Sequence, residues 1–251
     1  MNATLTASTL ALLACTNAAL AQNELPFVTG EQLHYRVSVS KLGNIGEGVM
    51  SVGGPVDVRG TQALVLRSEI KAQVAFLKSD ERAESFIDPT RMAVLRYQKT
   101  GRGSMARGDV RVEVFPEEGR WEDAKGNVGE LPTDAPLDEL SFIYYLRTLP
   151  LDGDSVESVV KHYDPNRNPI AVRVLGRDTV RTKAGTFPTI VVEMKVKDPK
   201  RYGGEGGVIR INLSDDVYRY PVKIESHVPV FGSTVLTLEA FSCPRHLASR
   251  P

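Results

Sequence analysis

The sequence predicts a mainly β protein: a single large, curved antiparallel sheet, an open half-barrel, with one helix across its concave face. Two stretches, residues 31–115 and 170–241, consist of short apolar segments with period-two alternation, each bounded by Gly, Pro or Asp. Between them, only residues 136–149 have a helical pattern. One helix cannot form a layer of its own, so it must plug or lie across the hollow of a sheet.

The length of the chain is consistent with one domain, and its charge disfavours a nucleic-acid partner. A chain of 251 residues is long for one domain, but β-sheet proteins of about this length often form a single unit. We therefore expect one domain over residues 25–243 and a flexible tail at 244–251. The 31 basic and 31 acidic residues cancel and are interspersed, which disfavours binding to nucleic acid.

The first residues read as an export signal. Residues 1–21 carry no charged side chain, contain an apolar run and end in Ala19-Leu20-Ala21, which suits cleavage after Ala21 and a periplasmic or secreted protein. In a second interpretation, Leu12-Leu13-Ala14 precedes Cys15 as in a bacterial lipobox, and Cys15 is acylated. The apolar run is too short for a transmembrane segment, which needs about 20 residues.

Apolar and polar residues alternate clearly in the first half of the chain. In residues 31–40, Leu33, Tyr35 and Val37 alternate with polar side chains, which predicts a strand with one face in water. Strands are also expected at 49–52, 63–72, 82–87, 92–98, 110–115 and 156–163, with glycine-rich turns at 43–48 and 53–55. Residues 74–77 could be a helical turn or an apolar edge, and the basic, glycine-rich residues 99–108 a mobile hairpin loop.

The helix has standard signals at both ends. Pro136 suits the first helical position, Asp138 and Glu139 complement the helix dipole in the first turn, and Arg147 complements it at the far end. Apolar residues form two rows along it, so we expect the helix to be covered on both sides. The hollow beneath it is either a ligand cavity or filled by the helix itself.

No catalytic or metal-binding motif stands out, and we expect no cofactor and no metal site. Asp215-Asp216 lies between two strands, where it most simply forms a turn, and Asp80, Glu81 and Glu84 most simply mark the wet face of a strand. No His or Cys lies at ligand spacing from any of the four histidines, which are His34, His162, His227 and His246.

Three further residues or segments have a simple structural interpretation. Ser141 is not in a nucleophile elbow and is expected where the helix touches the sheet. Residues 203–207 are glycine-rich but lack the Lys-Ser/Thr of a phosphate loop, which predicts a flexible loop. Cleavage after Ala21 would leave Cys243 as a lone thiol, an apolar filler or partly exposed rather than a nucleophile.

Several short motifs, taken in order, resemble a known family. They are Leu140-Ser141 with Tyr144-Tyr145-Leu146-Arg147, Gly176, Ala184-Gly185-Thr186-Phe187, Leu213-Ser214-Asp215-Asp216, Pro221-Val222-Lys223-Ile224 and Gly232-Ser233. Together they resemble the bacterial family called domain of unknown function 3108, over about residues 25–241, with mild departures at Arg177 and Asn212. The resemblance implies an exported protein whose fold is similar to the half-barrel of the lipoprotein carriers LolA and LolB, with no established activity.

These observations favour a non-enzymatic cell-envelope protein that binds or chaperones an apolar, lipid-like ligand in the half-barrel. The expected ligand-binding residues lie on the helix, at Leu140, Phe142, Tyr144, Tyr145 and Leu146. The alternative is an envelope interaction or assembly protein that holds a protein partner by its sheet edges or by residues 99–108, without a ligand cavity. A hydrolase using Asp215 and Asp216 ranks third.

Overall fold

A computed structural model describes residues 25–104, 108–153, 156–197, 207–228 and 232–244. The first group of strands comprises β1 (Gln32–Val39), β2 (Gly43–Val58), β3 (Thr61–Val74), β4 (Leu77–Asp88), β5 (Ala93–Arg102), β6 (Val110–Phe115), β7 (Arg120–Asp123) and β8 (Val128–Glu130). The second comprises β9 (Val156–Val159), β10 (Ile170–Thr182), β11 (Gly185–Val196), β12 (Gly207–Ser214), β13 (Pro221–Val228) and β14 (Gly232–Ser242). The helix α1 (Glu139–Leu146) and short 3₁₀ turns at Pro116–Glu118 and Pro165–Arg167 complete the described elements.

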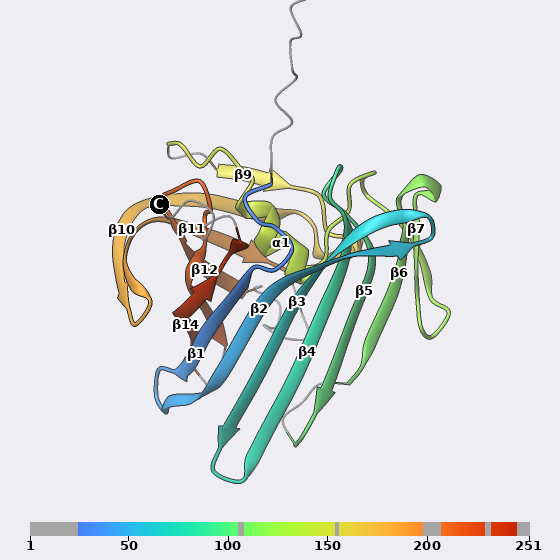
Figure 1. Ribbon diagram of the computed structural model, residues 1–251. Helices are drawn as coiled ribbons and strands as arrows, with labels where there is room; N and C mark the ends of the chain where they lie inside the picture. The colour runs from blue at the N-terminus through green and yellow to red at the C-terminus, as the bar shows by residue number, and fades with distance from the viewer. Residues whose placement is uncertain (1–24, 105–107, 154–155, 198–206, 229–231, 245–251) are drawn as a thin grey trace, which may run out of the picture.

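All these strands belong to one antiparallel sheet, in the order β8-β7-β6-β5-β4-β3-β2-β1-β14-β13-β12-β11-β10-β9. Each group is a simple meander, and the two meanders join where β1 pairs with β14, with Leu33 opposite Phe241 and Val39 opposite Thr234. In the described part of the chain β8 and β9 remain unpaired edges, so the sheet curls without closing (Figure 1). The predicted mainly β, open, curved sheet with a single α-helix is confirmed.

Alternation along each strand separates an inner face from an outer face. On β1, Leu33, Tyr35 and Val37 are at most 2% exposed and point inward, whereas His34 and Arg36 point to solvent. Most inner side chains of both meanders and of α1 form one large apolar core, and inner residues of β5 and β6 form a second, smaller cluster with Tyr163. Burial of this core is the main favourable term in folding, at about 25 cal/mol per Å² of apolar surface removed from water.

Two predicted strand boundaries are wrong. Residues 43–48 lie within β2, and Gly53 and Gly54 do not end it, because a bulge between Gly53 and Val56 lets the ladder continue to Val58. Gly46 shows why glycine suits this strand: a Cβ there would lie 2.0 Å from the carbonyl oxygen of Lys71 on β3. These glycines serve close approach within the sheet rather than a turn.

Other segments also differ from expectation. Residues 74–77 are neither a helical turn nor an apolar edge but close the β3–β4 hairpin, with Ala75 at a φ of 53°. The segment 99–108 is only partly a loop, since residues 99–102 belong to β5 and residues 105–107 lie outside the described residues. The strand expected at 156–163 ends at Val159. The expected signal, its cleavage site, Cys15, His246 and residues 203–206 also lie outside the described residues.

Candidate functional site

The helix is shorter than predicted because Asp138 caps it. The Asp138 carboxylate accepts hydrogen bonds from the backbone N–H groups of Leu140 and Ser141, and the Asp138 N–H donates to the Ser141 hydroxyl. This reciprocal capping box starts α1 at Glu139 and leaves Pro136 outside the helix, and α1 ends at Leu146. Pro136 and Asp138 are therefore not in the first turn as predicted.

The helix cap is also attached to the sheet. The Ser85 hydroxyl on β4 donates to the Asp138 carboxylate over 2.7 Å, and both side chains are fully buried. Burial raises the pKa of Asp138 to about 6, although the hydrogen bonds from Ser141 and Ser85 oppose this shift. This contact fixes the start of α1 on the inner face of β4.

Most of the predicted ligand-binding residues are part of the core. Leu140, Phe142, Tyr144 and Leu146 are at most 5% exposed and pack into the main apolar cluster. Tyr144 meets Phe27 edge-to-face, with ring centroids 5.0 Å apart. The side chains of α1 therefore fill the hollow directly beneath the helix, and a ligand contact for these four residues stays a prediction.

Tyr145, the fifth predicted residue, faces the other side of the helix. It is partly buried and borders a shallow cavity of about 450 Å³, together with Thr133, Glu157 and Lys161. The Lys161 ammonium lies 5.6 Å from the centre of its ring. This small cavity lies at the margin of the apolar core, since Val159 belongs to that core and also lines the cavity.

A buried ion pair holds the end of α1. The Arg147 guanidinium donates to both oxygens of Glu31 at 2.6 and 2.8 Å, and neither side chain has any exposed surface. It also donates to the carbonyl groups of Pro26 and Tyr218. Burial lowers the pKa of Arg147, but the Glu31 hydrogen bonds outweigh it and raise the pKa above its ordinary value. Arg147 thus joins three chain segments rather than only complementing the helix dipole.

The inner face becomes less covered with distance from the helix. Along β3, Leu66 is fully buried, whereas Ile70 is only partly buried, and on β4 Ser85 is buried and Ala83 partly so. Ile209 on β12 and Leu236 on β14 are also partly buried and adjoin the core. We call Ile70, Ala83, Ile209 and Leu236 the open end of the inner face.

A charged pair lies on this same face. The Lys99 ammonium contacts the Glu81 carboxylate over 2.7 Å, and the two side chains are 22% and 24% exposed. Lys99 lies opposite Ala83 across the β4–β5 ladder, which places the pair beside the open end. The expectation that Asp80, Glu81 and Glu84 share one wet face is wrong, because adjacent strand residues point to opposite faces and Glu81 points inward.

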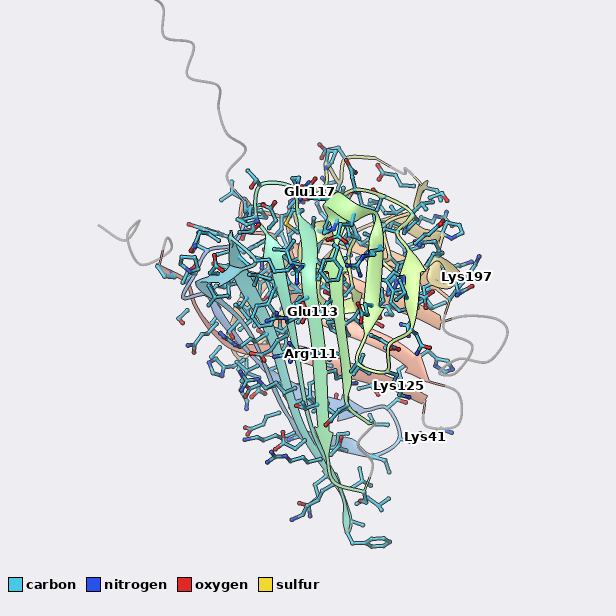
Figure 2. All side chains as sticks on the ribbon, turned by 90° about the vertical axis from the view of Figure 1, so that its right-hand side faces the viewer. Lys41, Arg111, Glu113, Glu117, Lys125 and Lys197 are labelled. Carbon is cyan, nitrogen blue, oxygen red and sulfur yellow. The ribbon has the colours of Figure 1, made fainter. Side chains whose placement is uncertain are left out.

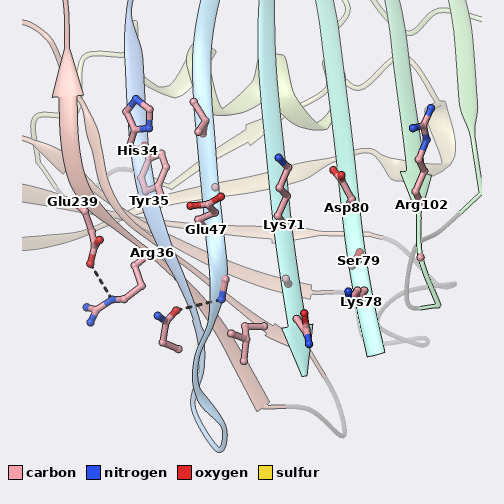
Figure 3. A pocket seen from close by; sticks show the side chains of 18 residues that line it. His34, Tyr35, Arg36, Glu47, Lys71, Lys78, Ser79, Asp80, Arg102 and Glu239 are labelled. Atoms are coloured by element: carbon pink, nitrogen blue, oxygen red, sulfur yellow. Dashed lines mark hydrogen bonds and ion pairs between the residues drawn. The ribbon is translucent and has the colours of Figure 1, made fainter. Parts of the chain in front are cut away.

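The outer face carries its own groove, of about 790 Å³, across β14 and β1 to β5 (Figure 3). A row of charged residues with alternating sign crosses it, one from each of these strands: Glu239, Arg36, Glu47, Lys71, Asp80 and Arg102. Lys78 on β4 also lines the groove. Arg36 pairs with Glu239 at 3.4 Å. Figure 2 shows that charged side chains, including Arg111 and Glu113, continue over the outer face. Cross-strand pairs of opposite charge stabilise a solvated sheet surface, which is the simplest role for this row.

The structure does not bring the other candidate residues together. His34 lines the outer groove, His162 is buried beside Glu139 with 3.8 Å between their polar atoms, and His227 is exposed on β13. Within the described ranges, no cluster of three or more His, Cys, Asp or Glu could hold a metal ion. Cys243 is a buried free thiol.

Asp215 and Asp216 form a turn, as the sequence suggested. Asp216 accepts hydrogen bonds from Ser214 and from the backbone N–H groups of Tyr218 and Arg219, and Asp215 pairs with Arg177 at 2.9 Å. Sequence reasoning missed the long-range pairs Ser85–Asp138, Glu31–Arg147 and Glu81–Lys99. The period-two alternation along β4 places Glu81 and Asp80 on opposite faces, and it could have indicated the Glu81–Lys99 pair but neither of the others.

Comparison with known proteins gives a family and a fold. The family model described as "Protein of unknown function (DUF3108)" matches residues 34–239. No curated protein matches significantly. A β-barrel-like protein of domain of unknown function DUF1849 from Brucella abortus superposes with a TM-score of 0.60 at 12% identity, covering 86% of this chain and 98% of that one.

Two further solved structures are less similar. One is a protein named as exported, with a YmcC-like fold, from Bacteroides fragilis, with a TM-score of 0.37 at 13% identity, covering 87% of this chain and 98% of that one. The other is named as a lipoprotein, from Parabacteroides distasonis, with a TM-score of 0.32 at 12% identity and the same coverage. These TM-scores are too low to support an argument. In the part of the chain that the structure describes, no helix could span a membrane.

Proposed function

This chain belongs to the DUF3108 family, which has no established activity, and we propose that it is a non-enzymatic cell-envelope protein that binds a lipid-like ligand on the open end of its inner face. The ligand would lie on Ile70, Ala83, Ile209 and Leu236, beyond the part of the sheet that α1 covers. The partial exposure of these apolar residues at the margin of a buried core is the observation that carries the proposal.

Binding there would remove apolar surface from water. Each Å² of apolar surface buried contributes about 25 cal/mol, so an acyl chain covering several of these side chains gains a substantial part of its binding free energy from this term. Lipid-binding sites are mostly apolar with a few polar groups that fix orientation. The open end has this composition, because the Glu81–Lys99 pair lies beside it.

The charged pair indicates an amphipathic ligand rather than a hydrocarbon. Lys99 could contact a carboxylate or phosphate of a head group, and Glu81 an ammonium group. Exchanging their mutual contact for contacts to a ligand would keep both charges neutralised. A hydrocarbon covering the pair would instead remove both charges from water and offer no polar contact to replace the lost hydration.

Export and the absence of catalysis are also part of the proposal. Export rests on the expected signal at residues 1–21, with cleavage after Ala21 or acylation at Cys15 as the alternatives. A non-enzymatic role is supported by Asp215 and Asp216, whose carboxylates are engaged in turn and surface contacts. The double variant with Asp215→Asn and Asp216→Asn tests the alternative of a carboxylate hydrolase. If it functions as the wild-type protein does, neither carboxylate is catalytic.

The proposal can be tested with two neighbouring substitutions. Leu236 and Val235 are neighbours on β14. Leu236 faces inward opposite Val37 of β1, and Val235 faces outward opposite Ser38 of β1. Leu236→Asn should lower the affinity for a fluorescent fatty acid about tenfold and reduce copurified lipid in mass spectra, because it places an amide on the proposed site. Val235→Asn is the matched control and should bind as the wild-type protein does. Equal binding by both variants, or no binding by the wild-type protein, would refute the proposal.

A second candidate function is attachment to a protein partner through the sheet edges. Val128 on β8 and Val156 on β9 are 60% and 64% exposed, and both strands have one unpaired side in the described sheet. An added strand could pair there by backbone hydrogen bonds. Photo-crosslinking from position 156 in the native cell should then trap a specific envelope protein, whereas recovery of only the free chain would count against this function.

A further inference from the structure

Three turns of the first meander lie at one end of the molecule. In an antiparallel meander the turns after β1, β3 and β5 lie at the same end, and Figure 1 shows the β1–β2 turn, the β3–β4 turn and the end of β5 at the end away from α1. The β3–β4 hairpin extends furthest (Figure 1). We call residues 40–46, 72–79 and 100–104 the tip turns.

The tip turns expose large apolar side chains. Phe76 is 86% exposed at the end of the β3–β4 hairpin, Leu77 beside it is 36% exposed, and Leu42 in the β1–β2 turn is 53% exposed. A phenylalanine in water at a protruding turn contributes nothing to the fold, because the apolar core lies elsewhere. Leu77 follows it in the chain and Leu42 lies in another turn at the same end, and this exposed apolar surface indicates a contact made outside this chain.

The charge of the tip turns differs from that of the whole chain. Lys41, Lys78 and Arg102 lie in these turns, and the described residues 40–46, 72–79 and 100–104 include no acidic side chain. The complete chain carries no net formal charge. Glu47, Asp80 and Asp109 lie just beyond the turns, and Asp80 is opposite Arg102 in the β4–β5 ladder, so Lys41 and Lys78 are the basic side chains at the extremity of the tip.

We propose that the tip turns bind the surface of an anionic lipid bilayer, with Phe76 and Leu42 inserted below the head groups and Lys41 and Lys78 among them. A surface that is negatively charged outside and apolar beneath complements this arrangement better than an apolar protein groove, which would not attract the basic side chains. Amphipathic surfaces with an apolar body and basic residues bind bilayers in this way. This inference does not depend on ligand binding by the inner face.

The geometry would place the open end of the inner face near the bilayer. Ile70 lies on β3 between the core and the hairpin turn, so a tip seated on lipid brings this part of the sheet closest to the membrane. Two apolar side chains bury less hydrocarbon than a single myristoyl chain, which alone gives only marginal, reversible binding, so the apolar anchors need the lysines for measurable binding. Binding should therefore depend on both the apolar anchors and the anionic lipid.

The experiment uses the full chain with tryptophan reporters at two equally exposed positions. Val217, in the β12–β13 turn at the opposite end, is 81% exposed and is the matched control for Phe76. Trp121 stays in both variants as a common background. With vesicles of phosphatidylcholine and phosphatidylglycerol, Phe76→Trp should show a blue-shifted emission and quenching by brominated acyl chains, and Val217→Trp should show neither.

Sedimentation with the same vesicles measures the affinity of the protein for the bilayer. Phe76→Ser should weaken binding about tenfold while its thermal midpoint stays unchanged, and pure phosphatidylcholine vesicles should bind the wild-type protein at least tenfold less than anionic ones. Failure to bind anionic vesicles, equal quenching of the two tryptophan reporters, or full binding by Phe76→Ser would each overturn the proposal. Equal binding to both lipid compositions would overturn the role of the basic side chains.

Discussion

Replacing Glu31 by Gln tests whether the end of α1 depends on the buried ion pair with Arg147. The substitution keeps the shape of the side chain but removes the countercharge of a guanidinium that has no exposed surface. Arg147 would still donate to the carbonyl groups of Pro26 and Tyr218, which are neutral acceptors. The folded protein would then contain an uncompensated buried charge, whereas the unfolded chain would hydrate it.

The expected loss of stability is large. Removing one partner of a buried ion pair costs about 3–5 kcal/mol, compared with about 0–1 kcal/mol for an exposed pair. With a urea slope of about 3 kcal/mol per M, the unfolding midpoint should fall by roughly 1–1.7 M. The rings of Phe27, Tyr144 and Tyr220, 5.2–5.6 Å from the guanidinium, recover only part of this loss.

The assay is urea unfolding followed by far-UV circular dichroism, with an exposed pair as control. On the outer face Glu239 contacts Arg36 and Lys183, whose side chains are 45% and 72% exposed, so Glu239→Gln should change the free energy of unfolding by less than about 1 kcal/mol. The double variant Glu31→Met with Arg147→Met should be more stable than Glu31→Gln, because it leaves no unpaired charge. A loss below 1 kcal/mol for Glu31→Gln would refute the reasoning.

Three further predictions each concern a single residue. Gly46→Ala should destabilise the protein by about 2 kcal/mol or more in urea unfolding, because its Cβ would meet backbone at 2.0 Å, while Gly108→Ala, with no atom within 4 Å, should not. The pKa of Asp138 is raised by burial from 3.8 to about 6, so the folded state holds this proton more tightly than the unfolded state. Stability should therefore fall by about 2 kcal/mol as pH rises from 4 to 6, and Asp138→Asn should abolish this fall. The buried Cys243 should react with a thiol reagent at least tenfold more slowly in the native protein than in urea.

The sheet was predictable because its signal is local. Alternation such as that of Leu33, Tyr35 and Val37 needs only neighbouring residues, and it gives both the strand and its buried face. The two termini of the helix were less predictable. Asp138 is a residue type that often caps helices, but the sequence does not show whether it precedes the helix or lies in its first turn. Its carboxylate also accepts a hydrogen bond from Ser85, more than fifty residues earlier in the chain, and local sequence patterns do not reveal such a contact.

The candidate site was harder to predict than the fold because it depends on what covers each residue. The pattern of α1 predicted apolar faces, and the structure buries Phe142 and Tyr144 as expected of a helix covered on both sides. Whether a covered face contacts a ligand or other parts of the same chain is decided by distant segments such as Phe27. Periodicity along one segment contains no information about that choice.

The same reasoning explains why the proposed ligand surface lies away from the helix. A curved sheet of long strands extends beyond the reach of a helix of eight residues, which is about 12 Å long. Inner-facing residues within that length are sealed by α1, and those beyond it, such as Ile70 and Leu236, keep partly exposed apolar surface. The mismatch between strand length and helix length therefore creates the open end, and a longer helix in this position would close it.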